Sequence, residues 1–164
     1  RYAQDGSFMY QIRYEYGEQM GYSYFGKDGK LVPEIPFVYG SGKMKSYFAN
    51  GNVSCVLEYA DGVLNGDYIR YHPNGKVYIE DKQSWGDTEG PRKEYYADGK
   101  LRSVYNNNHN NYHGPYKEYD EKGVLIEEGN YYNDDLHGEQ RFYDEKGKLK
   151  QVRVYYYGTL LEVK

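Results

Sequence analysis

A glycine recurs every 22 to 24 residues along this chain, and this regular spacing limits the folds that the chain can adopt. An aromatic residue stands four positions before each of these glycines, and an apolar residue stands two positions after it. The seven glycines are Gly6, Gly29, Gly51, Gly75, Gly99, Gly123 and Gly147. The aromatic residues before them are Tyr2, Phe25, Tyr47, Tyr71, Tyr95, Tyr119 and Tyr143. A fixed period of this length is typical of repeat proteins built from one supersecondary unit.

The residues around each glycine predict the tip of a β-hairpin. Residues 72–76 read His-Pro-Asn-Gly-Lys, in which proline favours the second position of a type I turn and glycine accepts the left-handed backbone that follows. We therefore predict a three-residue loop closed by a glycine bulge. In this geometry the aromatic residue faces the apolar residue across the hairpin, so Tyr119 is expected to pair with Leu125.

A second turn signal follows eleven residues after each glycine. The residue there is glycine, asparagine or aspartate, all of which tolerate a positive φ. These residues are Gly17, Gly40, Gly62, Gly86, Asn110, Asp134 and Gly158. Two turns per repeat imply two strands per repeat, and the frequent glycines leave no room for helices. We predict an all-β fold, an elongated antiparallel β-hairpin repeat that forms a solenoid or twisted sheet.

The repeats are expected to form a single domain over residues 1–164. Their approximate bounds are 1–21, 22–42, 43–66, 67–90, 91–114, 115–138 and 139–164, and the terminal repeats are partial. Two segments depart from the pattern. Val32–Gly42 holds two prolines and is short by two residues, and Asn106–Asn111 lacks the usual glycine. We expect irregular loops or bulges at both places.

Composition narrows the functional classes. The net charge is −4 and the basic residues are spread among acidic ones, which argues against a nucleic-acid partner. No apolar stretch is long enough to span a membrane as a helix. Much of the apolar content is tyrosine, with 24 residues against five phenylalanines. Tyrosine buries its ring and keeps its hydroxyl near water, so it suits shallow, half-exposed layers.

Residues that could carry chemistry are better explained by the repeat. His113 and His137 lie one period apart and could bring imidazoles to one metal ion, but each belongs to a recurring His-Gly pair. Cys55 is interpreted as a buried thiol and not as a nucleophile. The acidic pair Glu127 and Glu128 is interpreted as part of a solvated sheet surface. We predict no enzymatic activity, no cofactor and no metal.

Tyrosine clusters are the candidate contacts for a partner. Consecutive residues of a strand point to opposite faces, so each of two tyrosine pairs places one ring on each face. These residues are Tyr131, Tyr132, Tyr155 and Tyr156. Two interpretations stay open: an aromatic recognition surface, or tyrosine ladders that hold a single-layer sheet together. At the end of the chain, Leu160, Leu161 and Val163 form an apolar edge, and two outcomes stay open for it: self-association through this edge, or cover by another segment.

The hairpin pattern resembles a known family. With Asp-Gly-Val-Leu-Asn-Gly at Asp61–Gly66 and Asp-Asp-Leu-His-Gly at Asp134–Gly138, it is similar to the MORN repeat, and in particular to the bacterial variant found in the YwqK-type antitoxin family. The resemblance implies a non-catalytic scaffold that binds another protein, with a toxin as the partner to be neutralised. The alternative is an exported or cell-surface structural or adhesive repeat protein of a bacterium. Because the chain begins at Arg1 and not at methionine, a preceding segment is expected, and localisation stays open between cytoplasmic and exported.

Overall fold

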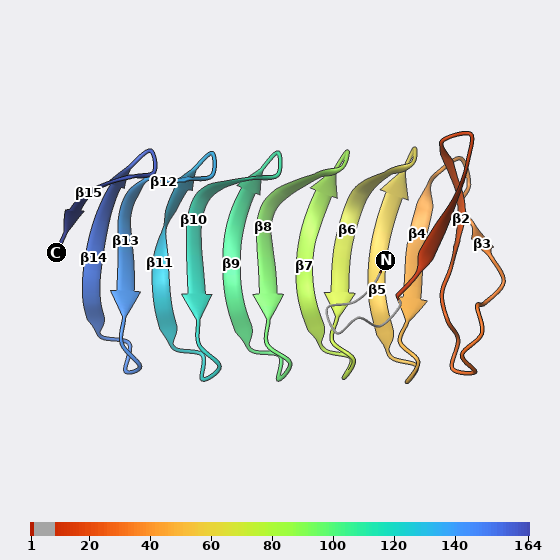
Figure 1. The fold of residues 1–164 in the computed structure, drawn as a ribbon, viewed down its shortest axis with the longest axis horizontal. Coiled ribbons are helices and arrows are strands. Elements are labelled where there is room, and N and C mark those ends of the chain that lie inside the picture. The colour runs from red at the N-terminus through yellow and green to blue at the C-terminus, as the bar shows by residue number, and fades with distance from the viewer. Residues whose placement is uncertain (2–8) are drawn as a thin grey trace. The chain divides into compact units, whose positions relative to one another are not determined.

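The computed structural model describes residue 1 and residues 9–164, and these residues form β-strands, turns and loops without any helix (Figure 1). The strands pair antiparallel throughout the described part of the chain. The prediction of an all-β antiparallel hairpin repeat is therefore confirmed. The predicted ladder positions Tyr2 and Gly6 lie outside the described residues. Over the part of the chain that is described, no helix offers the length and apolar character that crossing a membrane requires.

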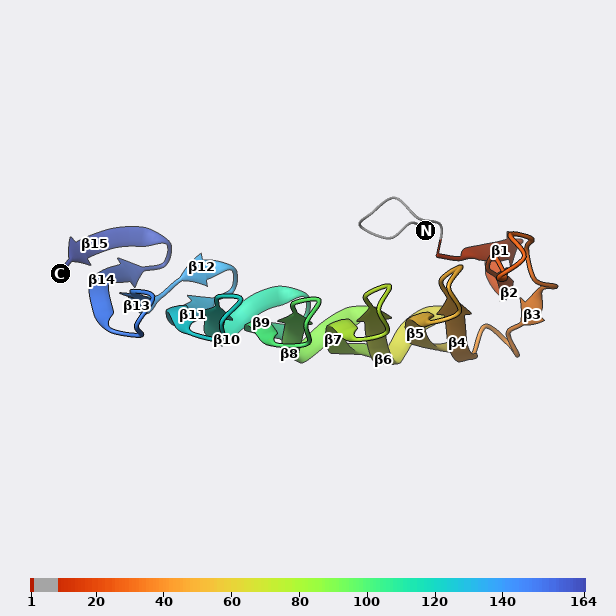
Figure 2. The ribbon, with the colours of Figure 1, turned by 90° about the horizontal axis from the view of Figure 1, so that it is seen from below.

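The chain divides into two compact units, which we call unit 1 (residues 1–86) and unit 2 (residues 87–164). In unit 1, one antiparallel sheet comprises β1 (Gln11–Glu15), β2 (Glu18–Ser23) and β3 (Ile35–Pro36). The next four strands pair in chain order and lie side by side in both views (Figure 1 and Figure 2): β4 (Gly42–Tyr47), β5 (Val53–Ala60), β6 (Val63–Tyr71) and β7 (Val77–Ser84). The single-domain prediction stays a prediction.

The strands of unit 2 also pair mainly with their neighbours in sequence. The first four are β8 (Asp87–Tyr95), β9 (Leu101–Asn108), β10 (Asn111–Tyr119) and β11 (Leu125–Tyr132). The last four are β12 (Asp135–Leu136), β13 (Gly138–Tyr143), β14 (Leu149–Tyr156) and β15 (Thr159–Val163). β11 pairs with both β12 and β13, and the order then continues through β14 to β15.

The hairpin tips at the period-defining glycines follow the predicted turn chemistry. Gly75 donates its N–H to the His72 carbonyl at 2.8 Å, and His72 donates to the Lys76 carbonyl at 2.8 Å. The six described glycines of this set have φ between 71° and 87°. The register shifts just before the aromatic residue, as a bulge requires. Tyr119 pairs with Leu125 and Tyr143 pairs with Leu149, so the predicted cross-strand pairs are confirmed.

The second set of turns has two consecutive residues with positive φ, as in a type I′ hairpin turn. In the turn between β5 and β6, Asp61 has φ 47° and Gly62 has φ 78°. Positive φ at the second position was predicted and is confirmed. The first position was not predicted, because its residues are mostly poor candidates for a left-handed backbone. These first residues are Tyr16, Tyr39, Asp61, Trp85, His109, Asn133 and Tyr157.

Both expected irregularities are present, in different forms. Within Asn106–Asn111 no irregular loop forms, because β9 continues to Asn108 and β10 starts at Asn111, but the β9–β10 register shifts between Tyr112 and Tyr116, opposite Asn106, as at a bulge. Asn110 adopts φ 67°, and its Oδ1 accepts the Thr88 N–H at 2.8 Å, so asparagine replaces glycine without disturbing the turn. Val32–Gly42 is irregular as predicted, because it contains only the two-residue β3 and an isolated bridge.

The apolar core lies in unit 1. Residues from β1–β3 and the segments beside them pack onto β4 and β5. The buried members of this cluster are Met9, Tyr10, Tyr22, Phe37, Met44, Cys55 and Leu57. Cys55 is fully buried, its Sγ lies 3.0 Å from the Ser46 Oγ, and burial raises the pKa of its thiol. In unit 2, all of which the structure describes, Tyr116 is the one buried hydrophobic side chain.

Candidate functional site

The strand register of unit 2 separates its side chains into two faces. Residues paired across neighbouring strands point to the same side, and residues adjacent in sequence alternate. Tyr105 pairs with both Arg92 and Tyr116, whereas Val104 pairs with Lys117 on the opposite side. We call the first side of β8–β13 the tyrosine face. It comprises Arg92, Ser103, Tyr105, Tyr112, Tyr116, Glu118, Glu127, Gly129, Tyr131 and Gln140.

The tyrosine face has an equivalent in unit 1 that is covered. Tyr105 stands six residues after Gly99, as Leu57 stands six residues after Gly51. Leu57 is 1% exposed, because Met9 and other residues of the core cluster pack over it. All strands of unit 2 belong to one sheet, so no second layer of residues 87–164 covers the tyrosine face in that way.

The rings of the tyrosine face form a contiguous stack. Tyr105 lies parallel to Tyr116, with ring centroids 5.1 Å apart and an interplanar angle of 7°. Tyr131 contacts Tyr116 at 5.0 Å and Tyr112 at 5.4 Å between centroids. The Tyr116 ring lies over Gly129, where a Cβ atom would come within 2.8 Å of the ring carbon Cε1. The stack therefore depends on a residue without a side chain at position 129.

Buried hydrogen bonds hold the phenol groups in place. Tyr116 donates its hydroxyl hydrogen to the Glu127 Oε1 at 2.7 Å, and Tyr105 donates to the Glu118 Oε1. Gln140 donates through Nε2 to the Tyr116 hydroxyl at 3.0 Å and to Glu127 at 2.8 Å. Burial, and then the hydrogen bond to the carboxylate, raise the pKa of Tyr105 and of Tyr116. Both phenols therefore stay protonated and act as donors.

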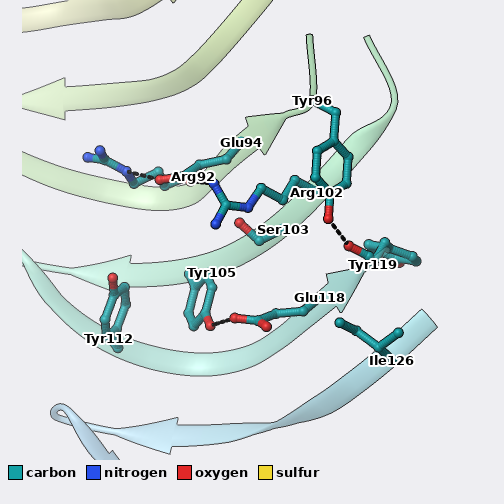
Figure 3. Close-up of a pocket in the computed structure, with 10 residues that line it drawn as sticks. All are labelled: Arg92, Glu94, Tyr96, Arg102, Ser103, Tyr105, Tyr112, Glu118, Tyr119 and Ile126. Atoms are coloured by element: carbon teal, nitrogen blue, oxygen red, sulfur yellow. Dashed lines mark hydrogen bonds and ion pairs between the residues drawn. The ribbon is translucent and has the colours of Figure 1, made fainter. Parts of the chain in front are cut away.

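A cavity of about 360 Å³ opens on this face between β8 and β11 (Figure 3). Glu94 lies between two cations, with Arg92 Nε at 3.9 Å and Arg102 Nη1 at 3.9 Å from its carboxylate oxygens. Tyr96 closes one end by donating its hydroxyl hydrogen to the Tyr119 carbonyl at 2.7 Å. The cavity thus combines aromatic surface with both signs of charge, which suits recognition of a partner side chain.

The structure does not bring the four predicted contact tyrosines together. Tyr131 belongs to the tyrosine face, and Tyr155 is half-buried on β14. Tyr132 and Tyr156 belong instead to an exposed aromatic cluster near the second turns. That cluster comprises His113, Tyr132, His137, Tyr156 and Tyr157.

The remaining candidates are placed as follows. His113 Nδ1 lies 3.0 Å from the Asn133 Oδ1, and the described residues contain no group of three or more His, Cys, Asp or Glu side chains placed to hold a metal ion. The glycines and aromatic residues of the first turns form the hairpin tips and their cross-strand pairs.

The carboxylates that accept the tyrosine hydroxyl hydrogens were not identified from the sequence. Glu127 was interpreted as solvated surface, but it is half-buried and accepts the Tyr116 hydroxyl hydrogen. Glu128, on the opposite face, is also half-buried and accepts the Tyr143 hydroxyl hydrogen at 2.6 Å. The signal that could have found Glu127 is the register itself. Counting outward from Gly123 pairs Glu118 with Glu127 beside the stacked rings.

Comparison with known proteins gives one clear match. The sequence profile of the family described as MORN repeat variant matches five segments, which together make up more than half of the chain: residues 41–61, 64–81, 88–106, 112–133 and 136–156. No curated protein matches the sequence. The matched segments cover the hairpins from β4 onward, including the strands that carry the tyrosine face.

Proposed function

The chain belongs to the family of MORN repeat variants, and from this premise we propose that it is a non-catalytic scaffold that binds another protein through the tyrosine face. Repeats of this family commonly bind proteins or membranes. The observation that carries the proposal is the difference between the two units. The side of the sheet that holds Leu57 is covered by other residues of unit 1, whereas no second layer of residues 87–164 covers the side that holds Tyr105.

The partner is expected to cover the tyrosine face with apolar and aromatic side chains, as residues of unit 1 cover the face that holds Leu57. Met9 and Tyr10 give apolar and aromatic side chains to the face of β4 and β5. A partner segment with similar side chains would pack against Tyr112, which is 38% exposed, and would enter the cavity beside Arg92. Tyrosine and arginine are enriched among residues that dominate binding energy, so this face has the composition of an interface centre.

We propose a toxin as the partner, so that the protein acts as an antitoxin or immunity protein. The support for this finer assignment is the likeness of the hairpins to those of YwqK-type antitoxins. The alternative is an exported or surface-associated structural role in a bacterium. A signal peptide in the full-length gene product would favour this alternative, whereas a neighbouring gene for a growth inhibitor would favour the antitoxin.

The test compares two double variants of the immobilised protein in capture from the source organism. One alters the tyrosine face, Tyr112→Ser with Arg92→Ala, and the other alters the opposite face, Lys117→Ala with Arg141→Ala. We expect the wild type and the opposite-face variant to capture the same protein, and the tyrosine-face variant to bind it at least about tenfold more weakly. Equal loss in both variants would contradict the proposal.

The antitoxin assignment has its own experiment. The captured protein is expressed alone and then together with the wild type or with each double variant. We expect it to arrest growth when it is alone, and we expect the wild type and the opposite-face variant to restore growth. A captured protein without toxicity would overturn the antitoxin assignment and leave the binding scaffold intact.

A further inference from the structure

A second cavity, of about 480 Å³, lies in unit 1 and is separate from the tyrosine face. Three tight turns form its walls, at residues 16–17, 39–40 and 61–62. Each turn belongs to the second set, in which two consecutive residues have positive φ. The site is therefore built from equivalent positions of three successive repeats.

Hydrogen bonds fix two of the three turns, at residues 39–40 and 61–62, against each other, and Gln19 beside the third turn donates to the Gly62 carbonyl. Gly62 donates its N–H to the Gly40 carbonyl at 3.0 Å, and Asp61 donates its N–H to the Ser41 Oγ at 3.0 Å. A Cβ atom on Gly40 would lie 2.7 Å from the Gly62 nitrogen, so the two turns touch along their backbones. Walls held in this way are already formed before a ligand arrives.

Gln19 lies in the wall with one polar atom unused. Its side chain is 6% exposed, and Nε2 donates to the Gly62 carbonyl at 2.9 Å and to the Tyr14 hydroxyl at 3.2 Å. The opposite amide orientation would place oxygen against the Gly62 carbonyl oxygen, so the assignment is fixed by its partners. Oε1 accepts no hydrogen bond from any described residue. A ligand that donates an N–H to this oxygen would relieve the cost of leaving it unpaired.

The rim of this cavity is acidic. Glu18 and Asp61 line it, and both residues are exposed. In the described part of the chain, neither carboxylate forms an ion pair or accepts a hydrogen bond. The rim therefore offers two negative charges that no cation of the described residues neutralises, and a cationic ligand is favoured.

Tyr39 adds an aromatic surface at an energetic cost. Its side chain is 92% exposed, although its backbone has φ 51°, a region that bulky residues avoid. A strained backbone of this kind is destabilising and is often found where a ligand binds. Asparagine or glycine would fit the turn with less strain, and aromatic residues stand at the same position of other second turns, at Tyr16, Trp85 and Tyr157.

We propose that this cavity binds the guanidinium group of an arginine side chain presented by a partner protein. A planar guanidinium offers five N–H donors, enough for Gln19 Oε1 and the two rim carboxylates, and its flat face can stack on the Tyr39 ring. Lysine carries the same charge but presents a compact ammonium without a flat face. The inference does not depend on the tyrosine face, because no residue is shared between the two sites.

The test uses N-acetyl-L-arginine N-methylamide as the probe, with the isotope-labelled protein observed by NMR. We expect saturable shifts of the Gln19 side-chain amide and of the Gly40 and Gly62 backbone amides. The corresponding citrulline and lysine amides are expected to bind at least about tenfold more weakly. Equal binding of all three compounds, or no shift of these signals at millimolar probe, would overturn the guanidinium assignment. Tighter binding of free arginine would overturn the assignment to a protein side chain.

Matched variants separate binding from folding. Glu18→Gln combined with Asp61→Asn removes the rim charge and is expected to weaken the probe at least about tenfold, whereas Glu145→Gln, at an exposed hairpin tip in unit 2, should leave binding unchanged. Tyr39→Asn is expected to keep or raise the melting temperature and to weaken binding several-fold, since it removes both the strain and the ring. A lower melting temperature with unchanged binding would make Tyr39 structural and contradict the site.

Discussion

Gly123, in the turn before β11, and Gly129, within β11, are both required as glycine, but for different physical reasons. Gly123 has φ 87°, and a Cβ atom there would touch nothing within 4 Å, so only backbone conformation favours glycine. Gly129 has no positive φ, but a Cβ atom there would strike the Tyr116 ring at 2.8 Å. The turn position was predictable from the sequence because its cause is local. The packing position was not, because it depends on a ring from another strand.

Gly129→Ala is the sharpest test at the residue scale. We expect it to lower the free energy of unfolding by about 1–3 kcal/mol, because the added methyl group overpacks the buried Tyr116 ring. Urea unfolding of the purified protein measures the loss. In a Tyr116→Ala background the same substitution should cost much less, since the two residues are in contact. Additive effects in this double-mutant cycle would show that the ring does not lie over position 129.

At the element scale, the tyrosine stack makes stability depend on alkaline pH. The pKa values of Tyr105 and Tyr116 are raised in the folded state, so below about pH 10 both states keep these protons and the full stability is present. Above this pH the unfolded state loses protons that the folded state retains, and the free energy of unfolding falls as pH rises. Tyr59 in unit 1, whose pKa burial raises to about 12, adds to the slope.

Urea unfolding at several pH values from 8 to 11.5, with phenolate absorbance as a second readout, measures this dependence. Replacing Tyr105 with phenylalanine should make the decrease between about pH 10 and 11.5 shallower, because one proton-linked group is removed. Tyr157→Phe, at an exposed turn, serves as the control. An unchanged slope in the Tyr105 variant would contradict the buried phenol–carboxylate pair.

The second turns make a further prediction about elements. Asn110 and Asp134 each use their side-chain Oδ1 to accept a backbone N–H of the preceding repeat, at 2.8 Å from Thr88 and 2.7 Å from Tyr112. Gly86 occupies the same repeat position, has φ 91°, and has open space where a Cβ would lie. In the Gly86→Asn variant, the asparagine Oδ1 should therefore accept the backbone N–H of Leu64 and raise the free energy of unfolding by about 0.5–1.5 kcal/mol. Gly86→Ala, which cannot form this bond, should lower the free energy of unfolding. A similar effect of both substitutions would refute the hydrogen bond between the repeats.

Element by element, the sequence was most informative where turn chemistry decides the structure. The hairpin tips at Gly75 and its equivalents followed from proline, asparagine and glycine at fixed offsets. The positive φ of Trp85 did not, because a tight two-residue turn imposes it against the preference of the residue. The cover over Leu57 was equally unpredictable, since it depends on which distant segment folds back onto the sheet.

At the scale of the whole molecule, each unit consists of antiparallel hairpins, but the two units bury their side chains differently. Unit 1 has an apolar core that the chain completes itself, and unit 2 relies on stacked tyrosines and their carboxylate partners. The tyrosine rings and their hydrogen bonds stabilise the sheet of unit 2, and part of the aromatic surface stays exposed and can be buried on binding. Under the proposed function, this difference leaves the tyrosine face of unit 2 for a partner.

The most direct test of this account is hydroxyl-radical footprinting of the protein alone and in complex with its captured partner. We predict that the partner protects Tyr112 and its neighbours on the tyrosine face, while Tyr132 and Tyr156 in the exposed aromatic cluster keep their reactivity. Protection of Tyr132 and Tyr156 with Tyr112 left fully reactive would contradict the account.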